Sequence, residues 1–139
     1  MKKEILLPDN HKRSLSSSLY LIEKLLTEME EVILDKNNTC CSEVLMDIDN
    51  AAISNNLAAI QEAKTQICSL VDKYDTTRKT QRLQRIIDTK RTKIWEILND
   101  SFSKKLKGYG SFPQKYSDEY DTDISKLIEI TNKINYLLF

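Results

Sequence analysis

The sequence is poor in the residues that interrupt helices: of its 139 residues, only two are Gly and two are Pro. Their scarcity predicts long, uninterrupted segments of secondary structure. Cysteine is also rare, and the three thiols of Cys40, Cys41 and Cys68 form no Cys-x-x-Cys pair. An odd number of cysteines without that spacing argues against a disulfide framework, so we expect a reducing, cytoplasmic setting.

Histidine occurs once, at His11, which limits the chemistry that the chain can support. A di-iron carboxylate bundle needs paired Glu-x-x-His motifs and is excluded. A zinc site would have to combine His11 with cysteines that we expect at opposite ends of the fold. We therefore expect no metal, no cofactor and no catalytic residue.

Lys90 projects onto an apolar stripe, where a buried amine could act as a base or a nucleophile. More often the aliphatic stem of such a lysine packs while its ammonium group reaches water. An enzyme that uses Lys90, or the vicinal thiols of Cys40 and Cys41, is the last of the function classes that we consider. The expected protein is not an enzyme.

Long apolar runs are also missing. The run near the start, Ile5-Leu6-Leu7, has three residues, whereas the core of a signal peptide needs about 7–15. No stretch approaches the roughly 18 apolar residues that a membrane-spanning helix needs. Residues 1–9 are expected to be a short lead-in to a single soluble domain that covers residues 1–139.

The formal net charge is zero, but basic residues concentrate in one stretch. Residues 76–107 hold ten of the 21 basic residues and only three of the 21 acidic ones. Within this stretch Ile87 and Ile94 recur with helical spacing, while Arg82 and Arg85 project to a different side. The pattern predicts an amphipathic helix with a basic outer face.

Apolar periodicity predicts four helices, over residues 10–36, 42–74, 77–107 and 117–138. Neither Gly nor Pro separates the second helix from the third. However, the stripe of Ile67 and Val71 lies opposite the stripe of Ile87 and Ile94, and one straight helix would have to bury two opposite faces. We therefore predict that the chain turns back near residue 75, and that the fold is an all-α, antiparallel up-down-up-down four-helix bundle.

Such a bundle would be acidic at the end near residues 36–42 and basic at the opposite end. Four basic residues are expected in the first turns of the third helix: Arg78, Lys79, Arg82 and Arg85. Cations there oppose the helix dipole by roughly a few tenths of a kcal/mol each, which suggests an anionic partner. The alternative is a solvated charged face without a partner.

The connection over residues 108–116 is rich in aromatic side chains. Four lie in it or just after it: Tyr109, Phe112, Tyr116 and Tyr120. Aromatic residues on a loop that contains glycine are common at protein contacts, although these could instead fold back and cap the helices.

Two further residues, Asn56 and Trp95, each allow two interpretations. Asn56 is either buried to fix a register or exposed at the margin of a seam, and Trp95 is either core margin or an exposed interface anchor.

The function that we expect first is a non-enzymatic protein–protein interaction module that self-associates. Its contact surface would be the aromatic loop or the apolar surface that the first and last helices leave uncovered, the last of which ends in Tyr136-Leu137-Leu138-Phe139. The second expected function is binding of a nucleic acid or another polyanion through Arg78, Lys79, Arg82 and Arg85. The neutral total charge and the lack of aromatic residues among these cations weigh against it.

Overall fold

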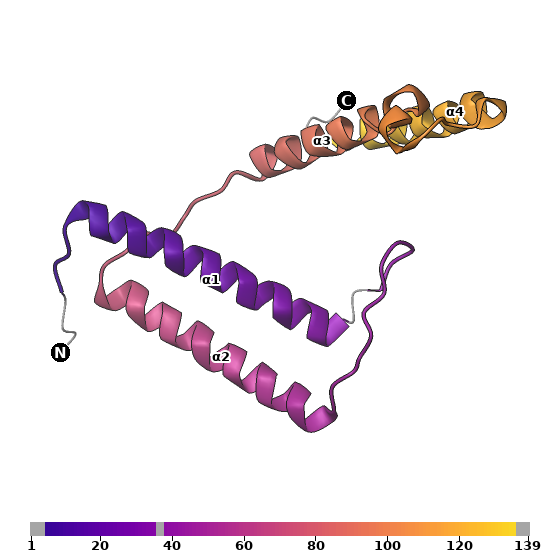
Figure 1. Ribbon diagram of the computed structural model, residues 1–139. Coiled ribbons are helices and arrows are strands. Elements are labelled where there is room, and N and C mark those ends of the chain that lie inside the picture. Colours follow the sequence, from indigo (N-terminus) through magenta and orange to yellow (C-terminus); the bar gives the residue numbers. More distant parts are fainter. Residues whose placement is uncertain (1–4, 36–37, 136–139) are drawn as a thin grey trace. The chain divides into compact units, whose positions relative to one another are not determined.

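The computed structural model describes residues 5–35 and 38–135, and this part of the chain contains helices and no strand (Figure 1). Its elements are α1 (Asp9–Asp35), α2 (Asn50–Lys73), α3 (Leu83–Asn99), the 3-10 helix η1 (Ser103–Tyr109) and α4 (Gln114–Thr131). The predicted all-α class is therefore confirmed. The chain forms two compact units, with α1 and α2 in residues 1–79 and the other helices in residues 80–139.

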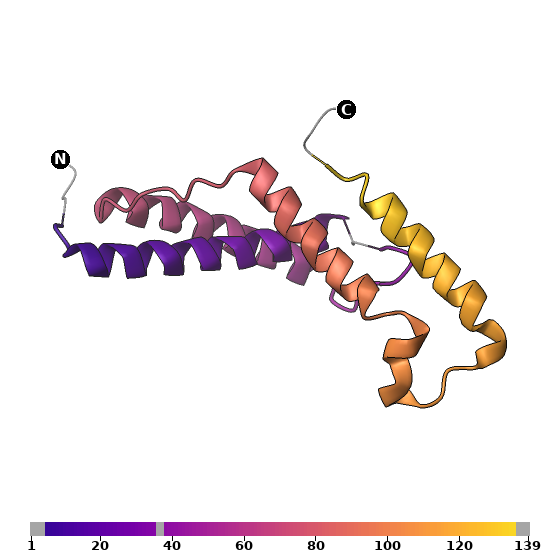
Figure 2. The same ribbon diagram turned by 90° about the horizontal axis from the view of Figure 1, so that it is seen from above.

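In the first unit, α1 and α2 pack side by side in antiparallel orientation (Figures 1 and 2). Leu19, Ile60 and Ile67 are the buried apolar side chains of this pair, each about 5–6% exposed. Between the helices, Lys64 Nζ lies 3.2 Å from Glu30 Oε1, and less than a quarter of either side chain is exposed. A shift of the helices would leave these shielded charges without their partner, so the ion pair helps to fix their register.

The second helix starts at Asn50, so the predicted start at residue 42 is wrong. Thr39 and Ser42 are residue types that often cap a helix, but here Thr39 Oγ1 accepts from the backbone N–H of Ser42 at 3.1 Å and closes a local turn. Such bonds between polar side chains and the backbone compete with helix formation. The actual cap is Asp49, whose carboxylate accepts from the backbone N–H of Ala52 at 2.8 Å.

The predicted break between the second and third helices is confirmed, because α2 ends at Lys73 and the next helix begins ten residues later; the four-helix bundle predicted from it is not confirmed. Asp75 has φ +52°, and the Thr76 N–H donates to the Val71 carbonyl at 3.1 Å. Together with a bond from the Asp75 N–H to the Asp72 carbonyl, these are the contacts of a Schellman C-cap. Asp75 thus takes part in ending α2.

The third helix spans Leu83–Asn99 rather than residues 77–107. Residues 76–82 are not helical, and three of them are Thr, whose β-branched side chain disfavours the helix. Beyond α3, residues 103–109 form η1 rather than a continuation of the helix. Gly110, with φ +109°, then turns the chain toward α4, a conformation that glycine reaches without a steric penalty.

The fourth helix starts at Gln114, three residues before the predicted start at residue 117, with Pro113 as its N-terminal flanking residue. It ends at Thr131, and residues 132–135 do not continue it. Residue 36 and residues 136–138, which the sequence prediction also assigned to helices, lie outside the described residues.

In the second unit, α4 returns antiparallel to α3 (Figure 2). Two hydrogen bonds between α3, α4 and the residues that follow them show this direction. The Tyr120 hydroxyl donates to the Ser101 carbonyl at 2.6 Å, and the Arg91 guanidinium donates to the Ile134 carbonyl at 3.1 Å. Leu98 is the one residue of this unit with less than a tenth of its surface exposed among those described. The unit thus has a thin core that one side of each helix provides.

Candidate functional site

The first helix carries more apolar surface than α2 covers. Leu19 is buried against α2, and Leu26 one flank away is half-buried. A second set with spacing of three and four residues, Ile22, Leu25 and Met29, is 48, 59 and 49% exposed. This spacing keeps the three side chains on one flank of α1. The helix therefore has two apolar flanks, of which one is open to solvent.

The corresponding flank of α2 carries small side chains. Ala52, Ala59 and Ala63 recur along it, and Leu70 follows with the same helical phase. Because α2 runs antiparallel to α1, its flank faces the same side of the pair as Ile22, Leu25 and Met29. We call these seven residues the open side of the α1–α2 pair. Large side chains on one helix beside mostly small ones on the other form an apolar surface against which a further helix could pack.

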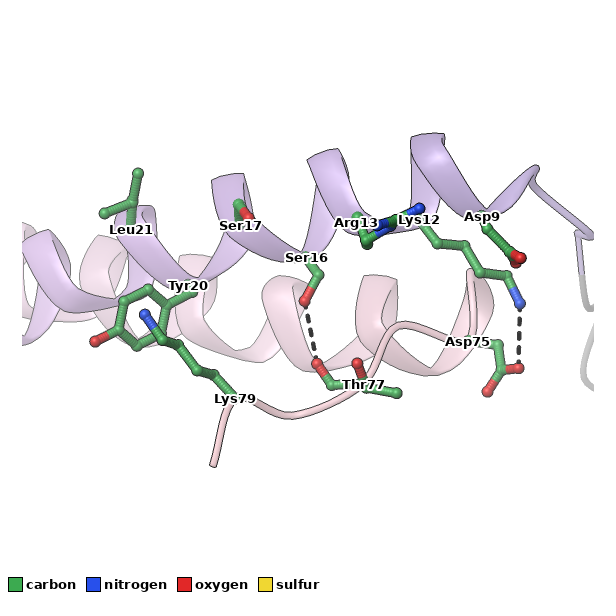
Figure 3. Close-up of a pocket in the computed structure, with 10 residues that line it drawn as sticks. All are labelled: Asp9, Lys12, Arg13, Ser16, Ser17, Tyr20, Leu21, Asp75, Thr77 and Lys79. Carbon is green, nitrogen blue, oxygen red and sulfur yellow. Dashed lines mark hydrogen bonds and ion pairs between the residues drawn. The ribbon is translucent and has the colours of Figure 1, made fainter. Parts of the chain in front are cut away.

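The other side of α1 is covered by the chain that follows α2. In Figure 3 the segment from Asp75 to Lys79 runs along α1, and three contacts hold it there. Lys12 Nζ lies 3.4 Å from an Asp75 carboxylate oxygen, and the Ser16 hydroxyl donates to the Thr77 carbonyl at 3.1 Å. The third contact places the Lys79 ammonium 4.3 Å from the centre of the Tyr20 ring, a cation–π interaction.

Between this segment and α1 lies a cavity of about 700 Å³ (Figure 3). Its lining is polar and mixed in charge: Asp9, Lys12, Arg13, Ser16, Ser17, Tyr20, Leu21, Asp75, Thr77 and Lys79. The cations of the lining already have partners, since Lys12 pairs with Asp75, Arg13 bonds to Asn10 and Lys79 lies over Tyr20. The cavity is therefore best described as a solvent-filled gap between α1 and the segment that runs along it, without a free cation among the described lining residues that is ready for a ligand.

The predicted basic site is not built as expected. Arg78 and Lys79 lie before α3 in non-helical chain, and Arg82 occupies its N-cap position. Only Arg85 lies in the first turn of the helix. The prediction that four cations in the first turns oppose the helix dipole was therefore wrong. Arg78, Arg82 and Arg85 are exposed, and within the part of the chain that the structure describes they form no ion pair.

The α3–α4 pair has an open apolar side of its own. Leu83 and Ile97 on α3 are 69 and 58% exposed, and they lie one flank away from the buried Leu98. On α4, Leu127 and Ile130 are 45 and 49% exposed, and their flank faces the same side because the helices are antiparallel. Ile134, 48% exposed, continues that line beyond the helix.

The four aromatic residues of the predicted contact loop divide into two pairs. The rings of Phe112 and Tyr120 are 4.7 Å apart between centroids, and Tyr120 also bonds to Ser101, so these two fold back onto the helices. Tyr109 and Tyr116 are 93 and 52% exposed. Half of the loop therefore caps the α3–α4 pair, and half stays available for contact.

Asn56, Trp95 and Lys90 can now be placed. Asn56 is exposed, and its side-chain amide donates to the Ala52 carbonyl at 2.7 Å, so it lies at the margin of the seam. Trp95 is 47% exposed, which fits an interface anchor better than a core residue. Lys90 is exposed rather than buried.

The three cysteines are exposed and unbridged, and His11 is exposed as well. Among residues 5–35 and 38–135, no group of three His, Cys, Asp or Glu side chains is placed to hold a metal ion. None of the helices in these residues combines the length and apolar character needed to cross a membrane.

Sequence reasoning missed the features that shape the open sides. The Glu30–Lys64 ion pair and the contact of Lys79 with Tyr20 join residues far apart in the chain, and no local sequence pattern predicts either contact. The exposed flank of α1 did have a signal, because its apolar stripe was too broad for a single partner helix.

Comparisons with known protein families, with curated proteins and with solved structures found no match to this chain.

Proposed function

We propose that this chain is a non-enzymatic, cytoplasmic protein–protein interaction module that self-associates. A helix pair of one copy packs by its open side against the open side of a helix pair of another copy, and the two pairs form an antiparallel four-helix bundle. The observation that carries the proposal is the apolar flank of Ile22, Leu25 and Met29, each about half exposed. The three exposed, unbridged thiols support a reducing compartment such as the cytoplasm.

The energetics support reversible association. Full burial of a Leu, Ile or Met side chain contributes about 1.5–3 kcal/mol, so covering a half-exposed one contributes about 1 kcal/mol. Six such side chains, three from each of two copies, would then contribute about 6 kcal/mol. This is of the same order as the lower estimates for the loss of translational and rotational freedom on association, about 4 kcal/mol.

The test is a pair of charge substitutions in the full chain. Leu25→Glu on the α1–α2 open side and Ile130→Glu on the α3–α4 open side each place a carboxylate where a partner would pack. We expect at least one of them to raise the dissociation constant of self-association about tenfold or more, because a buried unpaired charge is costly. Light scattering over a concentration series measures this.

Leu34→Glu is the matched control, since Leu34 is 62% exposed on α1 but lies off the open side. It should leave association unchanged where Leu25→Glu or Ile130→Glu weakens it. The proposal is wrong if neither Leu25→Glu nor Ile130→Glu changes the measured mass while circular dichroism shows that their helices are intact.

A second candidate function is polyanion binding through Arg78, Lys79, Arg82 and Arg85. It is supported by the exposure of three of these side chains, Arg78, Arg82 and Arg85, which have no ion pair within the described residues. The four cations lie within eight residues of the sequence, and Arg82 and Arg85 lie at the N-terminal end of α3, where the helix dipole also favours an anion.

Binding to single- or double-stranded nucleic acid should then fall steeply with salt, by about one log–log unit for each phosphate neutralised. We expect Arg82→Glu to lower both the affinity at low salt and this slope. Lys133→Glu, a charge reversal of an exposed lysine outside the basic segment, is the control. Undetectable binding at low salt, or an Arg82→Glu protein that binds like the parent, rejects this function.

A further inference from the structure

We propose that the open side of the α1–α2 pair is covered by the same side of a second copy, with a twofold axis near Leu25 that sets the two α1 helices antiparallel. This deepens the self-association proposed above and rests on it. Two features of the first unit carry it: the symmetry of the exposed α1 residues about Leu25, and the separation of charge along the pair.

The chain leaves the first unit on the covered side of α1. Asp75, Thr77 and Lys79 are held there by Lys12, Ser16 and Tyr20, so the open side carries no part of the connection to α3. The described residues of the first unit thus leave Ile22, Leu25 and Met29 about half exposed.

The α1 part of the open side is close to symmetric about Leu25. On α1, Ile22 and Met29 lie at nearly equal distances from Leu25, so an antiparallel copy would place Ile22 against Met29 of the partner.

Charge selects this orientation over the other twofold arrangement. The half of the pair next to the α1–α2 connection is strongly acidic, with Glu28, Glu30, Glu31, Asp35, Asp47 and Asp49. The opposite half is mixed in charge, with Lys12, Arg13, Lys73 and Lys79 beside Asp9, Asp72 and Asp75. A twofold axis along the helices would stack the two acidic halves together. An axis across them keeps the two acidic halves apart and places each beside the mixed half of the partner, which avoids this repulsion.

The test is disulfide formation across the axis. In the full chain with Cys40→Ser and Cys41→Ser, Leu25→Cys places a thiol near the proposed twofold axis, and copper phenanthroline with oxygen accepts the two electrons that each disulfide releases. Antiparallel copies bring the two residue-25 Cα atoms close to the 4.4–6.8 Å that a disulfide needs. We expect at least tenfold more covalent dimer than in the parent, with peptide mass spectrometry showing a bond between residue 25 of each copy.

The parent protein supplies the control, because its remaining thiol, Cys68, is exposed on α2 with a helical phase away from the open side. Cross-linking no stronger than in the parent, or a bond from residue 25 to Cys68 instead, overturns the proposal. If the uncross-linked chain still sediments as a dimer in those cases, self-association stands and only this interface is wrong. A chain that remains monomeric overturns both.

Discussion

Replacing Ile67 with Ala should lower the free energy of unfolding by about 2–5 kcal/mol, the largest effect on stability that we expect from a single truncation in this chain. Ile67 is 6% exposed and lies at the centre of the contact between α1 and α2. Removing its outer methyl groups loses their transfer free energy and leaves a cavity that the two helices cannot fully close. With only Leu19 and Ile60 buried beside it in this pair, few contacts remain to offset the loss.

Urea unfolding followed by circular dichroism measures this change. Because association stabilises the folded state by mass action, parent and variant have to be compared at one protein concentration. Ile67→Val should cost about 0.5–1.5 kcal/mol, and Leu34→Ala, at an exposed position of α1, should cost less than that. An Ile67→Ala protein as stable as Leu34→Ala would contradict the observed packing of α1 against α2.

Asp121→Ala should lower the stability of the α3–α4 pair by about 2 kcal/mol. One carboxylate oxygen accepts from the Ser103 N–H at 2.8 Å, and the other accepts from the Ser103 hydroxyl at 2.7 Å. These bonds hold the first residue of η1 against α4. Hydrogen bonds to a charged group contribute about 1.5–3 kcal/mol, and removing the acceptor leaves a partly buried donor without a partner.

Trp95 is the only tryptophan and lies on α3, so its fluorescence reports unfolding of this pair selectively. Ser103→Ala keeps the backbone bond to Asp121 and should cost about half as much as Asp121→Ala. Asp123→Ala, an exposed acid on the same helix, is the control for the loss of charge. Equal effects of Asp121→Ala and Asp123→Ala would show that the two bonds of Asp121 contribute nothing.

The break after α2 could be predicted from the sequence because it depends on helical phase alone. The stripes of Ile67 and Ile87 point in directions that one straight helix cannot bury together. The residue that ends the helix could not be identified in this way. Asp75 takes a left-handed conformation that Gly adopts more often, and the tertiary contact with Lys12 accompanies it.

The helix starts were predicted less well, because several residues could act as caps. Thr39, Ser42 and Asp49 are all good cap types, and the pattern of apolar residues extends upstream of Asp49 through Ile48 and Leu45. Local bonds at Thr39 decided the outcome. Similarly, the non-helical path of Arg78 and Lys79 follows from contacts of this segment with Ser16 and Tyr20, which only the folded chain supplies.

The sequence predicted that an apolar contact surface would remain uncovered, but it did not predict which residues form that surface. The excess of apolar residues on α1 indicated that one partner helix would not cover it, and Leu25 at 59% exposure shows where the excess lies. Two of the aromatic residues considered for contact, Phe112 and Tyr120, instead pack on each other. Their loop position did not reveal this, because the Tyr120–Ser101 bond depends on how α4 returns along α3.

Sedimentation equilibrium of the full chain over a range of concentrations tests the central claim most directly, since it measures mass without a probe or a substitution. The claim that open apolar sides drive self-association predicts a mass that rises from 16.2 kDa toward twice that value as the concentration increases. A constant mass of 16.2 kDa up to several hundred micromolar would contradict it.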